Sequence, residues 1–287
     1  MRILVTIAHY FSAEANSQHG STSERKRQDR QRAIEEVICA YRGQFGVSST
    51  LDVGTRSFQT APGSDDEIDI VAVTTSEKHL LTPEFCTRYG VRVAKLELEN
   101  PRMLGFGAQH IMAQQANRYD LFVFSEDDLR INDPSFFSKL AWFNQTYGPK
   151  RVLFPNRIEW SRRAATLKTY IDGDLNAAAA DRMVAHVEDD DALYGAPLGR
   201  HTVFRRARNP HAGYFAVTRD QLNYWMRQPH WLDRDTSFVT PLESAATLGV
   251  AKTFSIYKAF GRSAGFLEIE HMDSAFSDLK LPVVSTL

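Results

Sequence analysis

The sequence predicts an α/β protein whose mainly parallel central sheet is flanked by helices. Short apolar segments alternate with longer amphipathic ones over the first 130 residues, and this order is typical of parallel sheets with helices on both faces. The apolar segments are rich in branched side chains and lack helical periodicity, as in strands that are buried on both faces. The chain of 287 residues is 43% hydrophobic and 24% charged, which is enough apolar material for a sizeable core.

Four apolar segments of the first half are predicted as central strands: residues 2–8, 68–75, 91–98 and 120–125. Residues 24–45 carry an apolar face at helical spacing and follow Ser23, a candidate N-cap, so a helix is predicted there. The basic run RKRQDRQR, residues 25–32, is interpreted as the exposed face of this helix. A second helix is predicted in the later part of residues 103–119, and a strand or hairpin edge over residues 49–59.

The second half is less regular. Helices are predicted at residues 133–147, 173–191 and 240–250. Residues 201–228 predict a strand, a glycine-containing turn, a strand and a helix, and residues 252–260 and 266–273 predict late strands. No repeat or low-complexity linker marks a boundary. Residues 1–287 are therefore predicted to form one domain.

Bulk properties exclude several classes of protein. The net charge of -1 gives no indication of binding to nucleic acid or to an anionic membrane. Only two cysteines are present, which does not fit a disulfide framework and favours a reducing compartment, so a cytoplasmic location is predicted. The sequence has no signal-peptide pattern and no run of about 18 apolar residues, so no transmembrane segment is expected. Peripheral association with a membrane stays open.

The candidate site is the acidic triplet Glu126-Asp127-Asp128, which directly follows the apolar strand LFVF. Ligands of parallel sheets bind beyond the carboxyl ends of the strands, where this triplet lies. Adjacent carboxylates repel one another unless a cation or solvent screens them. Mg²⁺ and Mn²⁺ bind one or two protein carboxylates together with phosphate oxygens. The alternatives are a solvated turn at this position, and a competing metal site in the EDDD run at residues 188–191.

At this point the sequence resembles the GT-A glycosyltransferases. MRILVTIAHYF resembles their first strand, IDIVAVTTS a later strand on the nucleotide side, and MLGFGAQHIMAQQANRYDLFVFSEDD the helix and strand that lead into their acidic DxD-type motif. The resemblance implies a Rossmann-like GT-A fold with a nucleotide-sugar-binding half, residues 1–130, and an acceptor-binding half, residues 131–287. Glu126 and Asp128 match the outer positions of the motif, although the family has Asp where this chain has Glu126.

The resemblance also assigns expected roles to single residues. Glu126 and Asp127 would contact the donor, together with Ala8, His9 and Tyr10 at the end of the first strand, with Thr6 beside them. Asp128 and His271, the latter in EIEHMD near the C-terminus, would bind Mn²⁺ or Mg²⁺. Glu243, in the segment VTPLESAATLG, would be the catalytic base. Many members have Glu-Asp there, with the second residue as base, whereas Ser244 follows here.

The function implied is metal-dependent transfer of a sugar from a nucleotide-sugar donor to a hydroxyl group of a glycan or other acceptor. Inversion at the sugar carbon follows if Glu243 is the base. Two alternatives remain: a metal-dependent nucleotidyl or phosphoryl transferase, and a non-catalytic protein that binds nucleotides or carbohydrates on the same fold. No GxxxxGK[ST] phosphate loop is present, which disfavours the first alternative.

Each residue also has a structural interpretation. Glu243 fits the first turn of a helix, where a carboxylate favours the macrodipole. His271 fits a surface histidine in a charged segment. Trp160, Tyr214 and Trp225 are candidates for stacking against an acceptor sugar, but the core is the favoured place for them.

Overall fold

The computed structural model describes residues 1–12 and 24–282. Its centre is a five-stranded sheet in the order β13-β6-β1-β4-β5. The bounds of its strands are β1 (Arg2–Ala8), β4 (Glu67–Thr75), β5 (Val91–Leu96), β6 (Leu121–Glu126) and β13 (Tyr214–Thr218). The first four run parallel to one another, and β13 is antiparallel to β6. Renumbered along the chain, the parallel strands have the order 3-2-1-4, as in Rossmann-like sheets.

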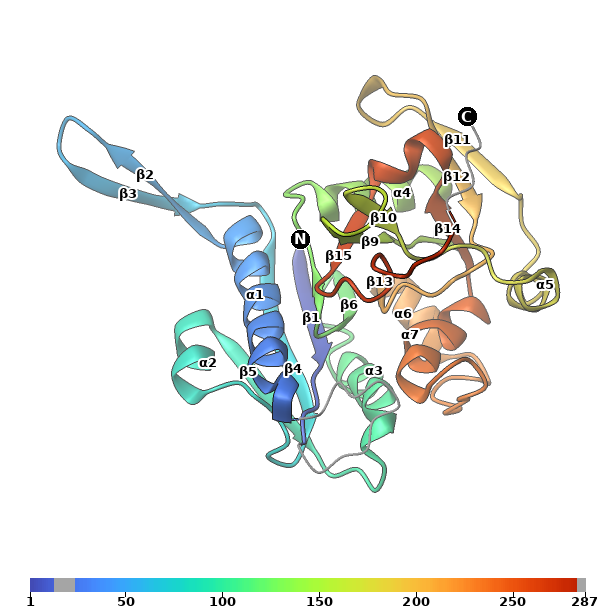
Figure 1. Ribbon diagram of the computed structural model, residues 1–287, viewed down its shortest axis with the longest axis horizontal. Helices are drawn as coiled ribbons and strands as arrows, with labels where there is room; N and C mark the ends of the chain where they lie inside the picture. Colours follow the sequence, from blue (N-terminus) through green and yellow to red (C-terminus); the bar gives the residue numbers. More distant parts are fainter. Residues whose placement is uncertain (13–23, 283–287) are drawn as a thin grey trace.

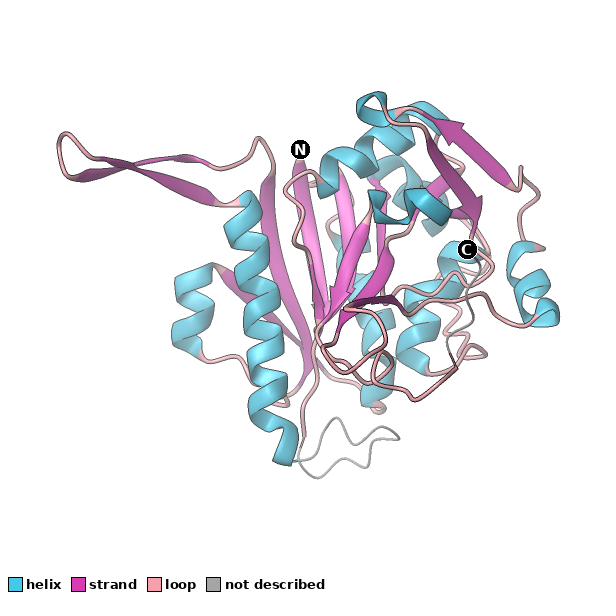
Figure 2. Ribbon diagram, turned by 45° about the horizontal axis from the view of Figure 1, so that its top comes forward, coloured by secondary structure: helices cyan, strands magenta, loops and turns pink. Residues whose placement is uncertain are grey.

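Helices cover both faces of this sheet. Ile70, Val71, Ala72 and Val73 of β4 are each at most 1% exposed, and neighbouring residues of a strand point to opposite faces. The covering helices include α1 (Arg27–Phe45), α2 (Pro83–Tyr89), α3 (Leu104–Gln114), α6 (Arg219–Met226) and α7 (Pro241–Ala251). Figure 2 shows these helices around the strands. The predicted fold class, a mainly parallel sheet flanked by helices, is confirmed.

The second half adds two four-stranded sheets, in the orders β10-β9-β15-β7 and β11-β12-β14-β8. Their strands are β7 (Leu129–Arg130), β8 (Arg151–Leu153), β9 (Asn156–Trp160), β10 (Lys168–Tyr170), β11 (Ala192–Gly195), β12 (Thr202–Arg206), β14 (Ser255–Ala259) and β15 (Glu268–His271). Two helices accompany them: α4 (Phe136–Tyr147) and α5 (Ala177–Val184). Figure 1 shows these sheets packed beside the central one, with β13 reaching back into it.

Two predicted helices differ from the observed ones at their ends. The helix predicted at 173–191 is limited to α5. Asn176 is its N-cap, since its side chain accepts from the amide of Ala179. Beyond the C-terminal end of α5, the acidic run turns back so that Asp189 accepts from Arg151. The helix predicted at 133–147 starts at Phe136, after a turn in which the Asp133 side chain accepts from the Ser135 amide. The predicted cap Ser23 lies outside the described residues.

The hairpin predicted at residues 49–59 is longer than expected. It consists of β2 (Val47–Asp52) and β3 (Ser57–Pro62), which form a two-stranded sheet of their own. The hairpin projects away from the rest of the protein in both views (Figures 1 and 2). Across residues 1–12 and 24–282, none of the helices combines the length and the apolar character needed to cross a lipid bilayer.

Candidate active site

The acidic triplet lies at the switch point of the central sheet, where the strand order reverses between β1 and β6. Glu126 is the last residue of β6 and pairs in register with Ala8, the last residue of β1. Open α/β sheets bind their ligands in the crevice outside the strand ends at this point. The carboxylates therefore stand where the fold itself creates a binding position.

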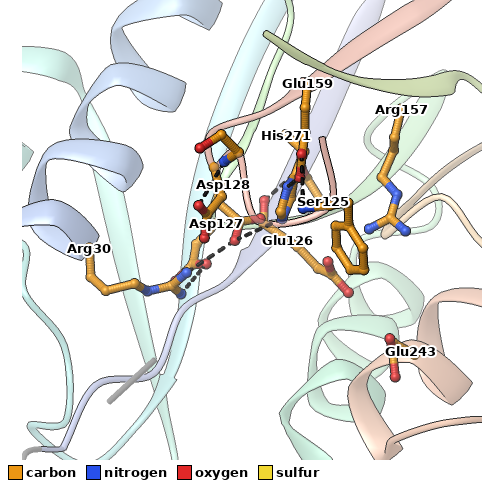
Figure 3. A network of polar contacts seen from close by, with 12 residues as sticks. Arg30, Ser125, Glu126, Asp127, Asp128, Arg157, Glu159, Glu243 and His271 are labelled. Carbon is orange, nitrogen blue, oxygen red and sulfur yellow. Dashed lines mark hydrogen bonds and ion pairs between the residues drawn. The ribbon is translucent and has the colours of Figure 1, made fainter. Parts of the chain in front are cut away.

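A short strand brings the C-terminal part of the chain to this position. β7 directly follows the triplet and pairs antiparallel with β15, so that Leu129 lies opposite His271. The amide of Met272 donates to the carbonyl oxygen of Asp128 at 2.8 Å. Asp128 and His271, which are separated by half of the sequence, thus become neighbours through backbone pairing (Figure 3).

Asp127 is held inside the protein by two side chains. Its Oδ2 atom lies 2.6 Å from Nδ1 of His9, and its Oδ1 atom accepts from the guanidinium of Arg30. Nε2 of His9 accepts from the amide of Leu80, so Nδ1 is the nitrogen that carries the proton and donates to Asp127. Burial favours a higher pKa for Asp127, but the charge of Arg30 and the bond from His9 outweigh burial and lower its pKa to about 2.

In this network His9 and Asp127, both predicted to bind the donor, have hydrogen-bond partners inside the protein. The side chain of His9 is 0% exposed and both of its ring nitrogens have partners inside the protein. Ala8 is also buried, and Tyr10 packs against the core. Thr6 donates from its hydroxyl to the carbonyl oxygen of Val123. Contact of the strand end with a nucleotide stays a prediction.

The two carboxyl oxygens of Asp128 differ in their contacts. Its Oδ2 atom accepts from Nη1 of Arg30 at 3.1 Å and lies 3.8 Å from Nε2 of His271. Its Oδ1 atom is buried and finds no hydrogen-bond partner among the described residues. A buried carboxylate oxygen without a partner lowers the stability of the folded protein, because no hydrogen bond replaces its lost hydration. A bound cation at Oδ1 would remove this cost.

His271 is oriented by a second carboxylate. Nδ1 of His271 lies 2.8 Å from Oε1 of Glu159, a side chain of β9 that is 0% exposed. Oε2 of Glu159 accepts from the amides of Phe276 and Ser277, which fixes the carboxylate in place. Burial favours a lower pKa for His271, but the bond with Glu159 and the charge of Asp128 outweigh it, so the pKa is raised.

The residues present fit a divalent cation. A metal-binding histidine usually donates its other ring nitrogen to a carboxylate or a carbonyl group, as His271 does to Glu159. Together Asp128 and His271 offer one carboxylate oxygen and one imidazole nitrogen, a donor set that suits Mn²⁺. Within residues 1–12 and 24–282, no three His, Cys, Asp or Glu side chains are grouped to hold a metal. Phosphate oxygens and water would have to complete the coordination.

Glu126 points to the opposite side of the cluster from Arg30, toward Arg157 and Glu243 (Figure 3). Burial and the charge of Asp128 raise the pKa of Glu126 to about 8. Gly213 makes room for this side chain. Its φ is +59°, and a Cβ atom at this position would lie 2.5 Å from Oε2 of Glu126. The glycine of the predicted turn therefore has a second function in packing.

Glu243 lies in the first turn of α7, as predicted. Thr240 caps the helix by accepting from the amide of Glu243. Oε2 of Glu243 is buried and unpaired within the part of the chain that the structure describes, and Oε1 lies 3.9 Å from Nε2 of His211. Burial, followed by the charge of Arg157, lowers the pKa of His211 to about 3. Its imidazole is therefore neutral and leaves Glu243 without a fixed cationic partner there.

A buried ion cluster supports this wall of the site. Arg157 donates twice to Oδ1 of Asp172, and Lys258 donates to Oδ2 of Asp172 and to the carbonyl oxygen of His211. Burial favours a higher pKa for Asp172, but Lys258 and Arg157 outweigh it and lower its pKa to about 2. The cluster connects the segment of Gly213 to β9, which carries Glu159.

The other residues that the sequence suggested for binding a metal or a sugar lie outside this cluster. In the EDDD run, Asp189 forms an ion pair with Arg151. Tyr214 and Trp225 are 0% and 1% exposed and belong to the core, as favoured, whereas Trp160 is 52% exposed. The basic run at residues 25–32 departs from its interpretation as an exposed face, because Arg30 within it turns inward to Asp127 and Asp128.

Sequence reasoning did not identify Arg30, Arg157 or Glu159 as parts of the site. Arg30 lies four residues before Ile34 on the buried stripe of α1, which is the one sequence signal that singles it out from the other basic residues. Arg157 and Glu159 share one face of β9 through strand alternation. Their meeting with His271 depends on the pairing of β9 with β15, which no local pattern reports.

No protein family model and no curated protein matches the sequence. Among solved structures, the chain is similar to glucosyl-3-phosphoglycerate synthase from Mycobacterium tuberculosis in complex with Mg²⁺ and uridine diphosphate. The identity is 14% and the TM-score 0.32, over 76% of this chain and 56% of that one.

A second similar structure is mannose-1-phosphate geranyltransferase from Thermus thermophilus. It is 8% identical with a TM-score of 0.37, over 94% of this chain and 74% of that chain. The Rossmann-like α/β class follows from the strand order described above.

Proposed function

We propose that the protein is a metal-dependent glycosyltransferase with a GT-A fold, which moves a sugar from a nucleotide-sugar donor to a hydroxyl acceptor. The observation that carries the proposal is the pair Asp128 and His271 at the switch point. One has a buried, unpaired carboxylate oxygen among the described residues, and the other is oriented for ligation by Glu159. On this proposal the donor lies against Ala8, His9, Tyr10, Glu126 and Asp127, and the acceptor on the side of residues 131–287.

In this mechanism each side chain has a defined task. Asp128 and His271 would hold Mn²⁺ or Mg²⁺, and the bound ion would neutralise the charge that grows on the departing nucleoside diphosphate. Glu159 fixes the ring of His271, and Arg30 fixes the turn that carries Asp127 and Asp128. Glu243 would accept the proton of the attacking hydroxyl group. Attack from the side of Glu243, opposite the leaving group, gives inversion at the sugar carbon.

The test is a thermal-shift screen of nucleotide sugars with and without Mn²⁺, followed by an assay of the products. A ligand at 100 times its dissociation constant adds about 2.7 kcal/mol to the free energy of unfolding. We expect one nucleotide sugar to stabilise the wild-type protein only with the metal, and the Asp128→Asn variant to lose this stabilisation. The matched control is Asp189→Asn, in the acidic run that pairs with Arg151.

The products distinguish the remaining alternatives. Release of a nucleoside diphosphate, in step with a glycosylated acceptor, agrees with the proposal. Release of pyrophosphate would instead assign nucleotidyl transfer. Metal-dependent binding without either product, even after long incubation with diverse acceptors, would assign a binding protein.

A further inference from the structure

The hairpin of β2 and β3 leaves the body of the protein as a ribbon. In the part of the chain that the structure describes, β2 and β3 pair with no further strand. Eleven of the twelve residues in its two strands are exposed, and Asp52 is half-buried. A two-stranded hairpin without further packing is marginally stable in water. The ribbon therefore lacks the contacts that such an element needs.

The two faces of the ribbon differ in chemistry. The register places Val47 opposite Pro62 and Leu51 opposite Phe58, and alternate residues of a strand share one face. This apolar face consists of Val47, Ser49, Leu51, Phe58, Thr60 and Pro62. The other face consists of Ser48, Thr50, Asp52, Ser57, Gln59 and Ala61. The alternation is the pattern of a ribbon with one covered face.

The apolar face is nevertheless open to solvent. Val47 is 75% exposed, Leu51 54% and Phe58 71%. Exposed strands are usually protected by lysine, inward charges or proline, because an open edge and an apolar face favour association. The two strands of this ribbon contain no lysine and no inward-facing charge, and their one proline is Pro62 at the end. The only charged residue in the strands is Asp52, which lies on the polar face. The ribbon is thus suited to contact another surface.

We propose that the apolar face of the ribbon binds the same face of a second copy of this chain, with the two ribbons antiparallel about a twofold axis. In this arrangement Leu51 and Phe58 near the tip of one ribbon cover Val47 and Pro62 near the base of the other. A surface that is complementary to itself in this way is the basis of twofold dimers.

Charge complementarity agrees with the antiparallel direction. The tip of the ribbon carries Arg56, and its base leads into Asp65, both of which are exposed. Antiparallel packing brings the tip of each copy to the base of the other, so Arg56 approaches Asp65 of the partner copy twice. Parallel packing would place like charges side by side.

The size of the face sets the expected strength. Six residues per strand span ~20 Å, and two strands ~10 Å, so the face covers about 200 Å². A stable interface usually buries about 800 Å² on each partner. The contacts of the tips with the bases add to the face, but the sum stays below this value. We therefore expect weak, reversible association.

The test is sedimentation velocity over ~1 to ~500 µM protein, a range that extends to the weak association expected of so small a face. The wild-type chain should shift from monomer to dimer. The variant Leu51→Asp/Phe58→Asp should stay monomeric throughout. The matched control, Thr50→Asp/Gln59→Glu, places the same number of charges on the polar face of the same ribbon and should dimerise like the wild type. Circular dichroism and unchanged thermal unfolding establish that each variant is folded.

A charge exchange tests the direction of packing. Arg56→Glu should weaken the dimer at low salt, and Arg56→Glu/Asp65→Lys should restore it. A wild-type chain that sediments as a monomer at every concentration overturns the proposal, and so does equal weakening by changes on both faces. If that monomer instead co-sediments with uncharged lipid vesicles through Leu51 and Phe58, the face binds lipid and the proposal is wrong.

Discussion

Nδ1 of His271 lies 2.8 Å from Oε1 of Glu159, and this bond turns Nε2 of the same ring toward Asp128. A surface histidine would have no need of a fully buried carboxylate behind it. The pair instead has the arrangement of a metal ligand and its supporting carboxylate. The chemistry proposed for the site depends on this relationship.

Glu159→Gln should weaken Mn²⁺ binding by about 10- to 100-fold, the usual cost of changing a supporting carboxylate. The glutamine side chain has only one acceptor oxygen, so it cannot accept from the ring of His271 and from the backbone amides of Phe276 and Ser277 as the carboxylate does. Mn²⁺ affinity would be measured by electron paramagnetic resonance with a nucleoside diphosphate present. The control is Glu268→Gln on β15, a carboxylate that bonds to Lys168 and Tyr170. Equal affinity in all three proteins would return His271 to the role of a surface residue.

Glu243→Gln should retain donor affinity and lose turnover by about 100-fold or more, because the amide keeps the shape but accepts no proton. Asp220→Asn is the matched control, since Asp220 also lies in the first turn of a helix, α6. Steady-state kinetics and nucleotide binding would be measured for both variants. A small, similar effect in the two would mean that Glu243 acts only on its helix terminus.

Gly213→Ala should damage the site as well as the backbone. The positive φ of this residue costs an alanine about 1 kcal/mol, and the added Cβ would lie 2.5 Å from Oε2 of Glu126. Gly261→Ala is the control, because Gly261 has φ +60° but no described atom within 4 Å of such a Cβ. Urea unfolding should show a larger loss for Gly213→Ala, and only that variant should lose turnover.

The buried cluster of Asp172 should make stability depend on acid. Its pKa is about 2 in the folded protein and roughly 3.9 in an unfolded chain. A lowered folded-state pKa stabilises the protein above the unfolded value, and this contribution is lost as the pH falls toward 2. Between pH 7 and pH 3 the loss is about 1 kcal/mol.

Asp172→Asn removes the titrating group. The difference in unfolding free energy between wild type and this variant should therefore narrow by about 1 kcal/mol from pH 7 to pH 3. Urea unfolding at several pH values measures it, with Asp174→Asn, in the neighbouring pair with Arg205, as the control. A constant difference would contradict the lowered pKa.

The sequence predicts the central sheet well because its strands are local apolar runs. The four parallel strands, the helix at residues 24–45 and the position of the acidic triplet all follow from such patterns. Helix ends were less predictable, since Asn176 and Asp133 set them through side-chain hydrogen bonds.

The supporting residues of the site could not be predicted. Arg30 differs from its basic neighbours in the sequence only by lying four residues before Ile34 on the buried stripe of α1, and this spacing does not reveal its partners Asp127 and Asp128. Glu159 and His271 meet because two strands that lie 112 residues apart pair in one sheet. Such contacts are properties of the topology, and a single sequence contains no local sign of them.

The placement of β13 has a consequence for synthesis of the chain. This strand completes the sheet by covering the open edge of β6, whose residues Phe122 and Phe124 are 0% exposed in the finished protein. The ribosome releases it only after a further ~88 residues, which takes on the order of 4 to 18 s. During this interval the edge of β6 has no partner strand on that side. The nascent chain therefore passes through a period in which the apolar edge of β6 is open to pairing with another chain.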